Sequence, residues 1–76
     1  EDMEAKIVVL NISDVDVPVR LTVHPEKNLW RAHAKYVDPF TKKEEFDSVT
    51  AATKVEAERE LLTNLTAFLK TRAQAE

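Results

Sequence analysis

Basic and histidine side chains gather in one short segment of the chain, and this is where binding chemistry is most readily placed. Residues 27–43 carry five basic side chains and one acidic one, although the whole chain has a formal net charge of −3. Arginine, lysine and histidine suit contacts to phosphates and to base edges. The segment therefore indicates a local cationic site for a ligand. The alternative is that acidic neighbours neutralise it across the strands.

Catalytic and metal chemistry has much less to build on. The chain has no cysteine and no glycine, which excludes disulfides, thiolate metal sites and glycine-rich phosphate loops. The expected strand register places His24 and His33 about 13 Å apart, too far to share a metal ion. Ser13 is expected in a turn and Ser48 in the core, so neither pairs with a histidine base. We expect no enzyme activity, no catalytic residue, no metal and no cofactor.

The elements that would position the basic residues follow from the hydrophobic pattern. Segments rich in β-formers predict strands over residues 6–12, 17–24, 29–37 and 44–49, and a period of 3.6 predicts a helix over 51–75. Residues 1–5 are expected to be frayed. The predicted fold class is α+β: a single domain over 1–76, built as a four-stranded antiparallel β-meander with one long C-terminal helix packed on one face (ββββα).

The turns must rely on Asp, Asn and Pro, because glycine is absent. We expect them at residues 13–16, 25–28 and 39–43, closed by the pairs Ile12:Val17, His24:Leu29 and Asp38:Glu44. Asn28 is expected to take the left-handed conformation of the second turn. These registers place one apolar set on the face beneath the helix, and a slip of one residue would invert a strand. That set is Val8, Leu10, Ile12, Val17, Val19, Leu21, Val23, Trp30, Ala32, Ala34, Tyr36 and Phe46.

The opposite face of the sheet is expected to be open. The residues predicted to lie on it are Ile7, Val9, Asn11, Arg20, Thr22, His24, Arg31, His33, Lys35, Val37, Glu45, Asp47 and Val49. Five of them form the predicted nucleic-acid-binding site, namely Arg20, Thr22, Arg31, His33 and Lys35. In this register Lys35 faces Asp47 with Glu45 close by, so cross-strand ion pairing remains the competing interpretation.

The predicted helix begins with a capping box, Thr53 followed by Glu56 three residues later. Its core-facing stripe comprises Val55, Ala57, Leu61, Leu62, Leu65, Phe68, Leu69 and Ala73. A helix of this length outreaches strands of seven or eight residues, so its last apolar turns are expected to overhang the sheet. We expect a partner interface or a homodimer contact at Ile7, Val9, Phe68 and Leu69.

About half of the chain resembles a known family. Residues 29–62 contain Leu-Trp-Arg-Ala-His-Ala-Lys-Tyr-Val-Asp-Pro, then Thr-Lys-Lys, Phe46 and Thr-Lys-Val-Glu-Ala-Glu. This resembles the AP2-like arm-type DNA-binding domain of phage and transposon tyrosine integrases. The resemblance implies a small sheet with one helix, with Arg31, His33 and Lys35 on the strand that reads DNA and Arg20 and Thr22 beside it. The acidic strand from Glu44 departs from the family, where that strand is usually basic.

Two functions follow as expectations. The first is a small DNA-binding module of a phage or mobile element that binds DNA through the basic face of its sheet. The alternative is a protein-binding accessory or inhibitor protein that is itself dimeric. No apolar run approaches the ~20 residues that a membrane span requires, so we expect a cytoplasmic protein with no membrane partner.

Overall fold

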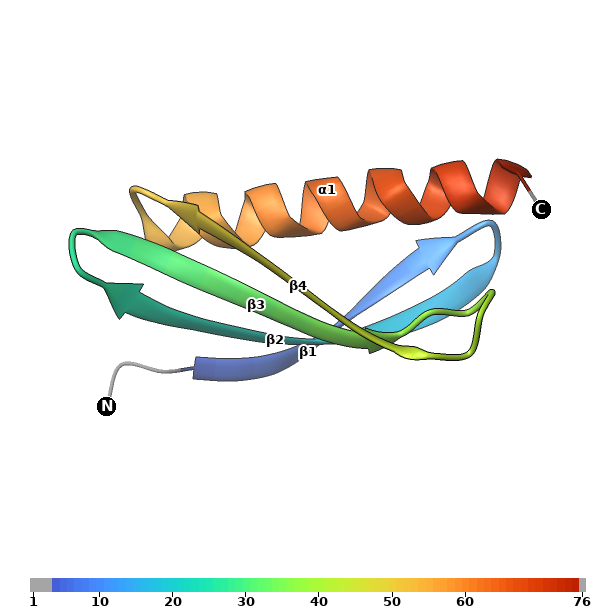
Figure 1. Cartoon of the computed structure of the whole chain (residues 1–76), viewed down its shortest axis with the longest axis horizontal. Coiled ribbons are helices and arrows are strands. Elements are labelled where there is room, and N and C mark those ends of the chain that lie inside the picture. Colours follow the sequence, from blue (N-terminus) through green and yellow to red (C-terminus); the bar gives the residue numbers. More distant parts are fainter. Residues whose placement is uncertain (1–3, 76) are drawn as a thin grey trace.

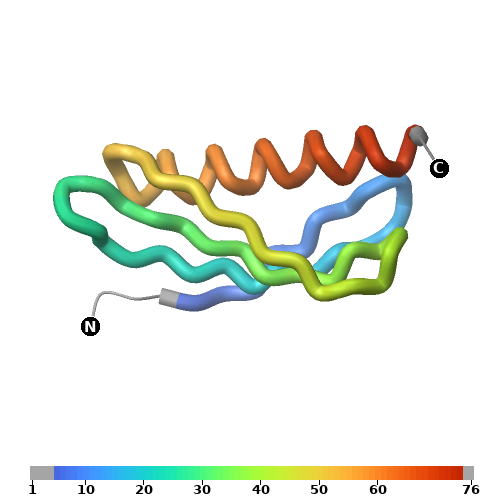
Figure 2. Tube along the Cα trace, in the orientation of Figure 1, coloured from blue at the N-terminus to red at the C-terminus, as the bar shows by residue number. Residues whose placement is uncertain are grey.

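The computed structural model describes residues 4–75, which form one sheet covered by one helix (Figure 1). The elements are β1 (Glu4–Ile12), β2 (Val15–Glu26), β3 (Leu29–Val37), β4 (Glu44–Ala51) and α1 (Lys54–Ala75). The strands are antiparallel and lie side by side in chain order. The helix runs along the length of the sheet on one face, as both views show (Figures 1 and 2). The predicted ββββα fold is confirmed.

The ends of the elements differ from the predicted ones by a few residues. Residues 4 and 5, expected to be frayed, belong to β1, whereas residues 1–3 lie outside the described part of the chain. β4 extends to Ala51, and α1 begins three residues later than expected. Thr53 caps the helix as predicted, because the Glu56 N–H donates to Thr53 Oγ1 at 3.1 Å. No helix within residues 4–75 is both long enough and apolar enough to cross a membrane.

The first two turns are tighter than expected. Ile12 pairs with Val15 and Glu26 with Leu29, so each turn has only two residues where four were predicted. Ser13 and Asp14 have φ angles of 51° and 69°, and Lys27 has 58°. Positive φ matches the right-handed twist of two-residue hairpins, and here Lys27 supplies it instead of Asn28. Each register moves by two residues, so every side chain of β1 and β2 keeps its predicted face.

The third register differs by one residue, and this inverts β4. Asp38 pairs with Lys43, since its N–H donates to the Lys43 carbonyl at 2.9 Å, where Glu44 was the predicted partner. The loop between them is closed by a Lys42 N–H to Asp38 carbonyl bond of 2.8 Å, with Lys42 at a φ of 67°. A left-handed lysine shortens the loop to four residues. Because faces alternate along a strand, the shorter loop turns every β4 side chain over.

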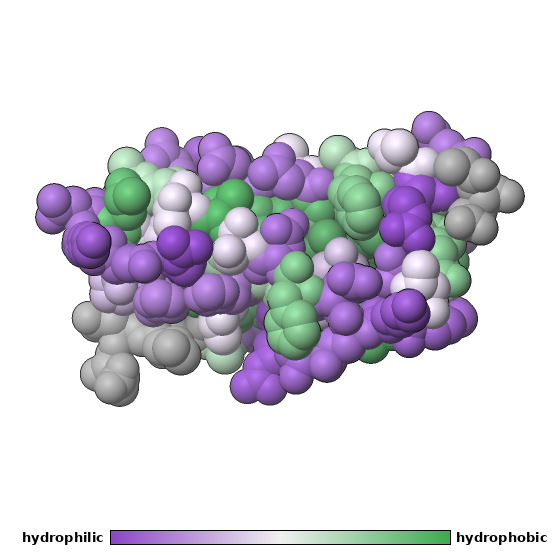
Figure 3. Space-filling model, viewed as in Figure 1, coloured by the Kyte–Doolittle hydropathy of each residue, from purple (hydrophilic) through white to green (hydrophobic). Residues whose placement is uncertain are grey.

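The core lies between the sheet and α1. Its completely or almost completely buried members are Ile12, Val17, Val19, Leu21, Val23, Ala32, Ala34, Tyr36, Ala57, Leu61, Leu65 and Leu69. Phe46 and Ser48 were both predicted to face the core and are misplaced, because the inverted β4 turns them outward and exposes 70% of Phe46. Val49 and Ala51 take the core-facing positions of β4 instead. Figure 3 shows hydrophobic atoms between the hydrophilic rims of helix and sheet.

The expected overhang of the helix is absent. Leu69 is completely buried, so it belongs to the core and not to a surface that a partner could contact. The buried stripe follows i, i+4 spacing through Ala57, Leu61, Leu65 and Leu69, and the flanking Val55 and Phe68 are 67% and 49% exposed. The prediction that Val55 and Phe68 face the core is therefore wrong. β1 and β2 are longer than the seven or eight residues expected, so the sheet extends farther along the helix than predicted.

Candidate nucleic-acid interface

The five residues of the predicted site lie together on the open face of the sheet, the face opposite α1. We call Arg20, Thr22, Arg31, His33 and Lys35 the basic patch. They occupy the two central strands, and the observed pairs are Arg20 with Lys35, Thr22 with His33, and His24 with Arg31. Their faces are fixed by the neighbouring residues Leu21, Ala32 and Ala34, which are buried under the helix.

Three rows of side chains cross the open face. The first runs from Ile7 through Arg20 and Lys35 to Phe46. The second runs from Ala5 through Thr22 and His33 to Ser48, and the third joins His24, Arg31 and Thr50. Phe46 and Ser48 thus border the basic patch, where acidic residues had been predicted.

The acidic residues expected to neutralise the patch lie on the other side of β4. Glu45 pairs with Tyr36 and Asp47 with Ala34, both of which face the helix. The pKa of Tyr36 is raised, first by burial and then by the charges of Glu45, Asp38 and Asp47, as expected for carboxylates on its own face. Lys35 consequently faces Phe46 and not Asp47.

The cations of the patch differ in their partners. Arg31 Nε donates to Glu26 Oε1, which lowers the pKa of Glu26, and Arg31 Nη1 donates to Ser48 Oγ at 3.3 Å. Lys35 Nζ lies 3.4 Å from Glu44 Oε2, with both side chains about half exposed. Arg20 makes no side-chain hydrogen bond or ion pair to any residue in the range 4–75. Exposed pairs of this kind stabilise a fold by at most about 1 kcal/mol, so a ligand can replace the carboxylates.

His24 and His33 are neighbours, and the predicted separation of about 13 Å is wrong. Their Nε2 atoms lie 3.1 Å apart, because the two-residue shift of β2 against β3 brings them into diagonal contact. The His24 Nδ1 is 3.2 Å from the Pro25 carbonyl, which can only accept, so the Nδ1 carries the proton. In the neutral pair, His33 then donates from Nε2 to His24 Nε2.

The two imidazole rings lie nearly parallel to one another, at an interplanar angle of 15°. Their centroids are 5.2 Å apart and their Nε2 atoms 3.1 Å apart, so the rings are stacked with an offset that brings these two nitrogen atoms together. Burial lowers the pKa of His33, and the charges of His24 and Arg31 lower it further against the opposing effect of Glu26. No three metal-ligating side chains cluster anywhere in the part of the chain that the structure describes.

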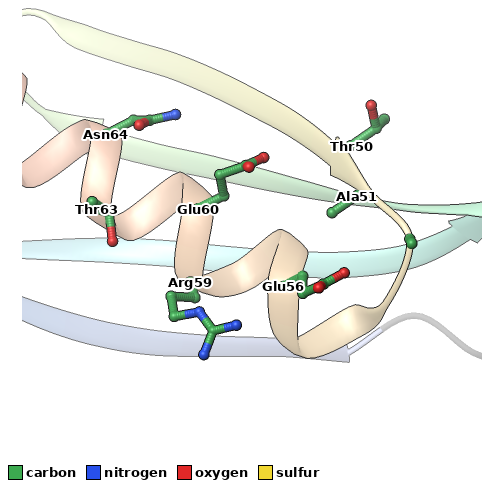
Figure 4. Close-up of a pocket in the computed structure, with 8 residues that line it drawn as sticks. Thr50, Ala51, Glu56, Arg59, Glu60, Thr63 and Asn64 are labelled. Carbon is green, nitrogen blue, oxygen red and sulfur yellow. The ribbon is translucent and has the colours of Figure 1, made fainter.

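Two surface hollows differ in their relation to the patch. The larger, of about 550 Å³, lies where β4 meets α1 and is lined by Thr50, Glu56, Arg59 and Glu60 among others. Figure 4 shows Glu60 and Asn64 extending towards the end of β4 while Arg59 points away from Thr50. Its charged lining residues are of mixed sign. The smaller, of about 260 Å³, lies in the patch itself. Its lining residues are Arg20, Thr22, His33, Ala34, Lys35, Phe46 and Asp47.

Three members of the rows on this face were not predicted from the sequence, namely Phe46, Ser48 and Thr50, and Val49 was wrongly placed there. The alternation of Val49 and Ala51 could have revealed them, since two apolar residues two positions apart at the end of β4 indicate which side of the strand faces the core. The predicted interface residues Ile7 and Val9 do lie on the open face, where they are 62% and 58% exposed.

Protein-family models, curated proteins and solved structures give no match to this chain.

Proposed function

We propose that the protein is a small DNA-binding module that binds through the basic patch on the open face of its sheet. The observation that carries the proposal is the position of Glu45 and Asp47, which face the helix side and leave Arg20 paired directly with Lys35 on the open face, with Arg31 two rows away on the same face. Arginine and lysine side chains that project from adjacent strands can contact successive phosphates. Their binding energy comes largely from the release of counterions.

The surroundings of the patch favour a polyanionic ligand. Arg20 is uncompensated among the described residues, and the carboxylates of Glu26 and Glu44 pair with Arg31 and Lys35 near the two ends of the strands. Phosphate groups can compete with both carboxylates, because the Lys35–Glu44 pair is about half exposed and the Arg31–Glu26 pair is partly exposed. Thr22 and Ser48 add neutral hydroxyl groups suited to phosphate and base contacts. The resemblance to integrase arm domains supports an origin in a phage or mobile element.

The test is equilibrium binding of dye-labelled oligonucleotides, followed by fluorescence anisotropy at low and moderate salt. Arg20→Ala and Lys35→Ala are expected to weaken binding and to reduce the salt dependence. Lys70→Ala is the matched control, because Lys70 is an exposed lysine on the helix and lies off the sheet. The proposal is refuted if the wild-type protein binds neither single-stranded nor duplex DNA, or if Lys70→Ala weakens binding as much as Lys35→Ala.

A protein-binding accessory or inhibitor function is the second candidate. It is favoured by the exposed Ile7 and Val9, because they lie on β1, an edge strand with free backbone groups that could pair with another chain. Sedimentation equilibrium tests its dimeric form. A dimer that Ile7→Lys dissociates would support this candidate, and a monomer at high micromolar concentration would contradict the dimeric form.

A further inference from the structure

We propose that the preferred ligand of this face is a single-stranded nucleic acid whose bases stack on three planar side chains, His24, His33 and Phe46. This inference rests on the proposed DNA-binding function and makes its ligand class specific. Neither the basic patch nor the exposed aromatic residue suffices alone. Their arrangement in adjoining rows of one sheet face is what favours a single strand.

The three rings form a diagonal across the sheet. His24 lies in the third row on β2, His33 in the second row on β3 and Phe46 in the first row on β4. Each step moves one strand sideways and two residues along, which corresponds to about 8 Å between successive Cα positions. The rings of His24 and His33 are stacked on one another with centroids 5.2 Å apart, so they form one flat platform, and Phe46 provides a second one on the neighbouring strand. Phenylalanine and histidine are among the side chains on which unpaired bases stack.

Phe46 is the anchor of this diagonal. It exposes 70% of its surface, more than any other large apolar residue in the described part of the chain. Its row neighbours are the cations Lys35 and Arg20, and the hollow of about 260 Å³ opens between them. An exposed aromatic ring beside cations is the combination that proteins use to hold single strands, with stacking on the ring and ion pairing to the backbone.

The charges around the diagonal suggest the path of the backbone. Arg20 and Lys35 flank the hollow beside Phe46, and Arg31 lies in the same row as His24. Glu44 is the acidic side chain at the β4 border of this face, where it pairs with Lys35. Phosphates are therefore favoured over the central strands β2 and β3, with bases directed along the ring diagonal.

The width of the face argues against insertion into a duplex. The major groove is about 12 Å wide and accommodates one helix or a two-stranded ribbon. Four strands span about 14 Å between the outer strand axes before side chains are added. The exposed Ile7 and Phe46 lie on the outer strands β1 and β4, where duplex phosphates would meet apolar groups. An unpaired strand lying across the face avoids this conflict, because its bases supply apolar partners.

The experiment compares Phe46→Leu with Phe68→Leu, since Phe68 is also an exposed aromatic residue but lies on α1. Fluorescence anisotropy measures binding to a 15-nucleotide pyrimidine strand and to a hairpin duplex of similar length. Phe46→Leu is expected to weaken single-strand binding by up to about 5- to 150-fold, the range that loss of one stacked base produces. Phe68→Leu is expected to leave it unchanged. The wild type is expected to bind the single strand more tightly than the hairpin.

The outcomes separate this inference from the function on which it rests. Equal single-strand affinity of Phe46→Leu and wild type overturns the inference, while a loss in Arg20→Ala would still support DNA binding. Tighter binding of the hairpin overturns it in the same way. If wild type binds neither probe, both proposals fail. Circular dichroism checks that the Phe46→Leu protein is folded, which is expected because the ring lies outside the core.

Discussion

The carboxylate of Asp38 determines where β3 ends and where β4 begins, and its removal is expected to destabilise the fold strongly. Its Oδ1 accepts the N–H groups of Phe40 at 2.7 Å and Thr41 at 3.1 Å. Its Oδ2 lies 3.4 Å from Nη1 of Arg72, and the side chain is only 2% exposed. These contacts tie the four-residue loop to the last turns of α1.

The magnitude follows from the two bonds to backbone donors. A hydrogen bond to a charged group stabilises a fold by about 1.5 kcal/mol or more, so Asp38→Ala is expected to lower the free energy of unfolding by about 3 kcal/mol. A chain of 76 residues has a total stability of roughly 4–11 kcal/mol. For a domain of this size the loss corresponds to a fall in Tm of about 12–24 °C.

The assay is urea and thermal unfolding followed by far-ultraviolet circular dichroism. Asp38→Asn keeps an acceptor oxygen for the two amides and removes the charge facing Arg72, so its loss is expected to be smaller than that of Asp38→Ala. Asp47→Ala, which alters an exposed carboxylate, is the control and is expected to change stability by less than about 0.5 kcal/mol. A loss below about 1 kcal/mol in Asp38→Ala would refute this role of the buried carboxylate.

Three further predictions concern the turn, the core and the histidine pair. Lys42→Gly is expected to raise the free energy of unfolding by about 1 kcal/mol in a urea titration, since glycine adopts the φ of 67° without the steric penalty of a Cβ atom. An unchanged free energy of unfolding would contradict the left-handed turn. Leu65→Ala removes a side chain that is 1% exposed and is expected to cost about 2–5 kcal/mol by the same titration, whereas an effect like that of a surface change would argue against this core. The pKa of His33 in the folded protein is lowered from 6.5, so the unfolded chain binds a proton at this residue first as the pH falls. The contribution of His33 to stability is therefore present above about pH 6.5 and is lost as the pH falls through the lowered pKa. Urea titrations at several pH values should show this loss, His33→Gln should reduce it, and an identical pH profile in the two proteins would count against the histidine contact.

The sequence predicted most of the fold because alternation along a strand tolerates register errors of two residues. The first two turns are each two residues shorter than expected, yet Val19, Leu21 and Val23 remain in the core. The side chains of β2 keep their face under such a shift, since its period is two. The same shift does change diagonal neighbours, which is why His24 and His33 were predicted far apart and are in contact.

The register of β4, and therefore which of its side chains face the core, was not predicted correctly from the sequence. The register depends on whether the loop has four residues or five, and the four-residue loop is fixed by the contacts of Asp38 together with the positive φ of Lys42. Lysine has no preference for the left-handed conformation, so the local sequence does not predict a positive φ at this position. The consequence for the site is large, because the one-residue change exchanges Asp47 for Phe46 on the open face.

The most direct test of the central claim is an amide NMR titration of the isotope-labelled protein with short single-stranded DNA at low salt. The account predicts shifts concentrated at Arg20, Thr22, His33, Lys35 and Phe46 that disappear as salt is raised. The amide signals of residues on the outer surface of α1, such as Lys70, should not shift. Shifts confined to the helix, or none at high micromolar DNA, would contradict the claim that the open face of the sheet binds nucleic acid.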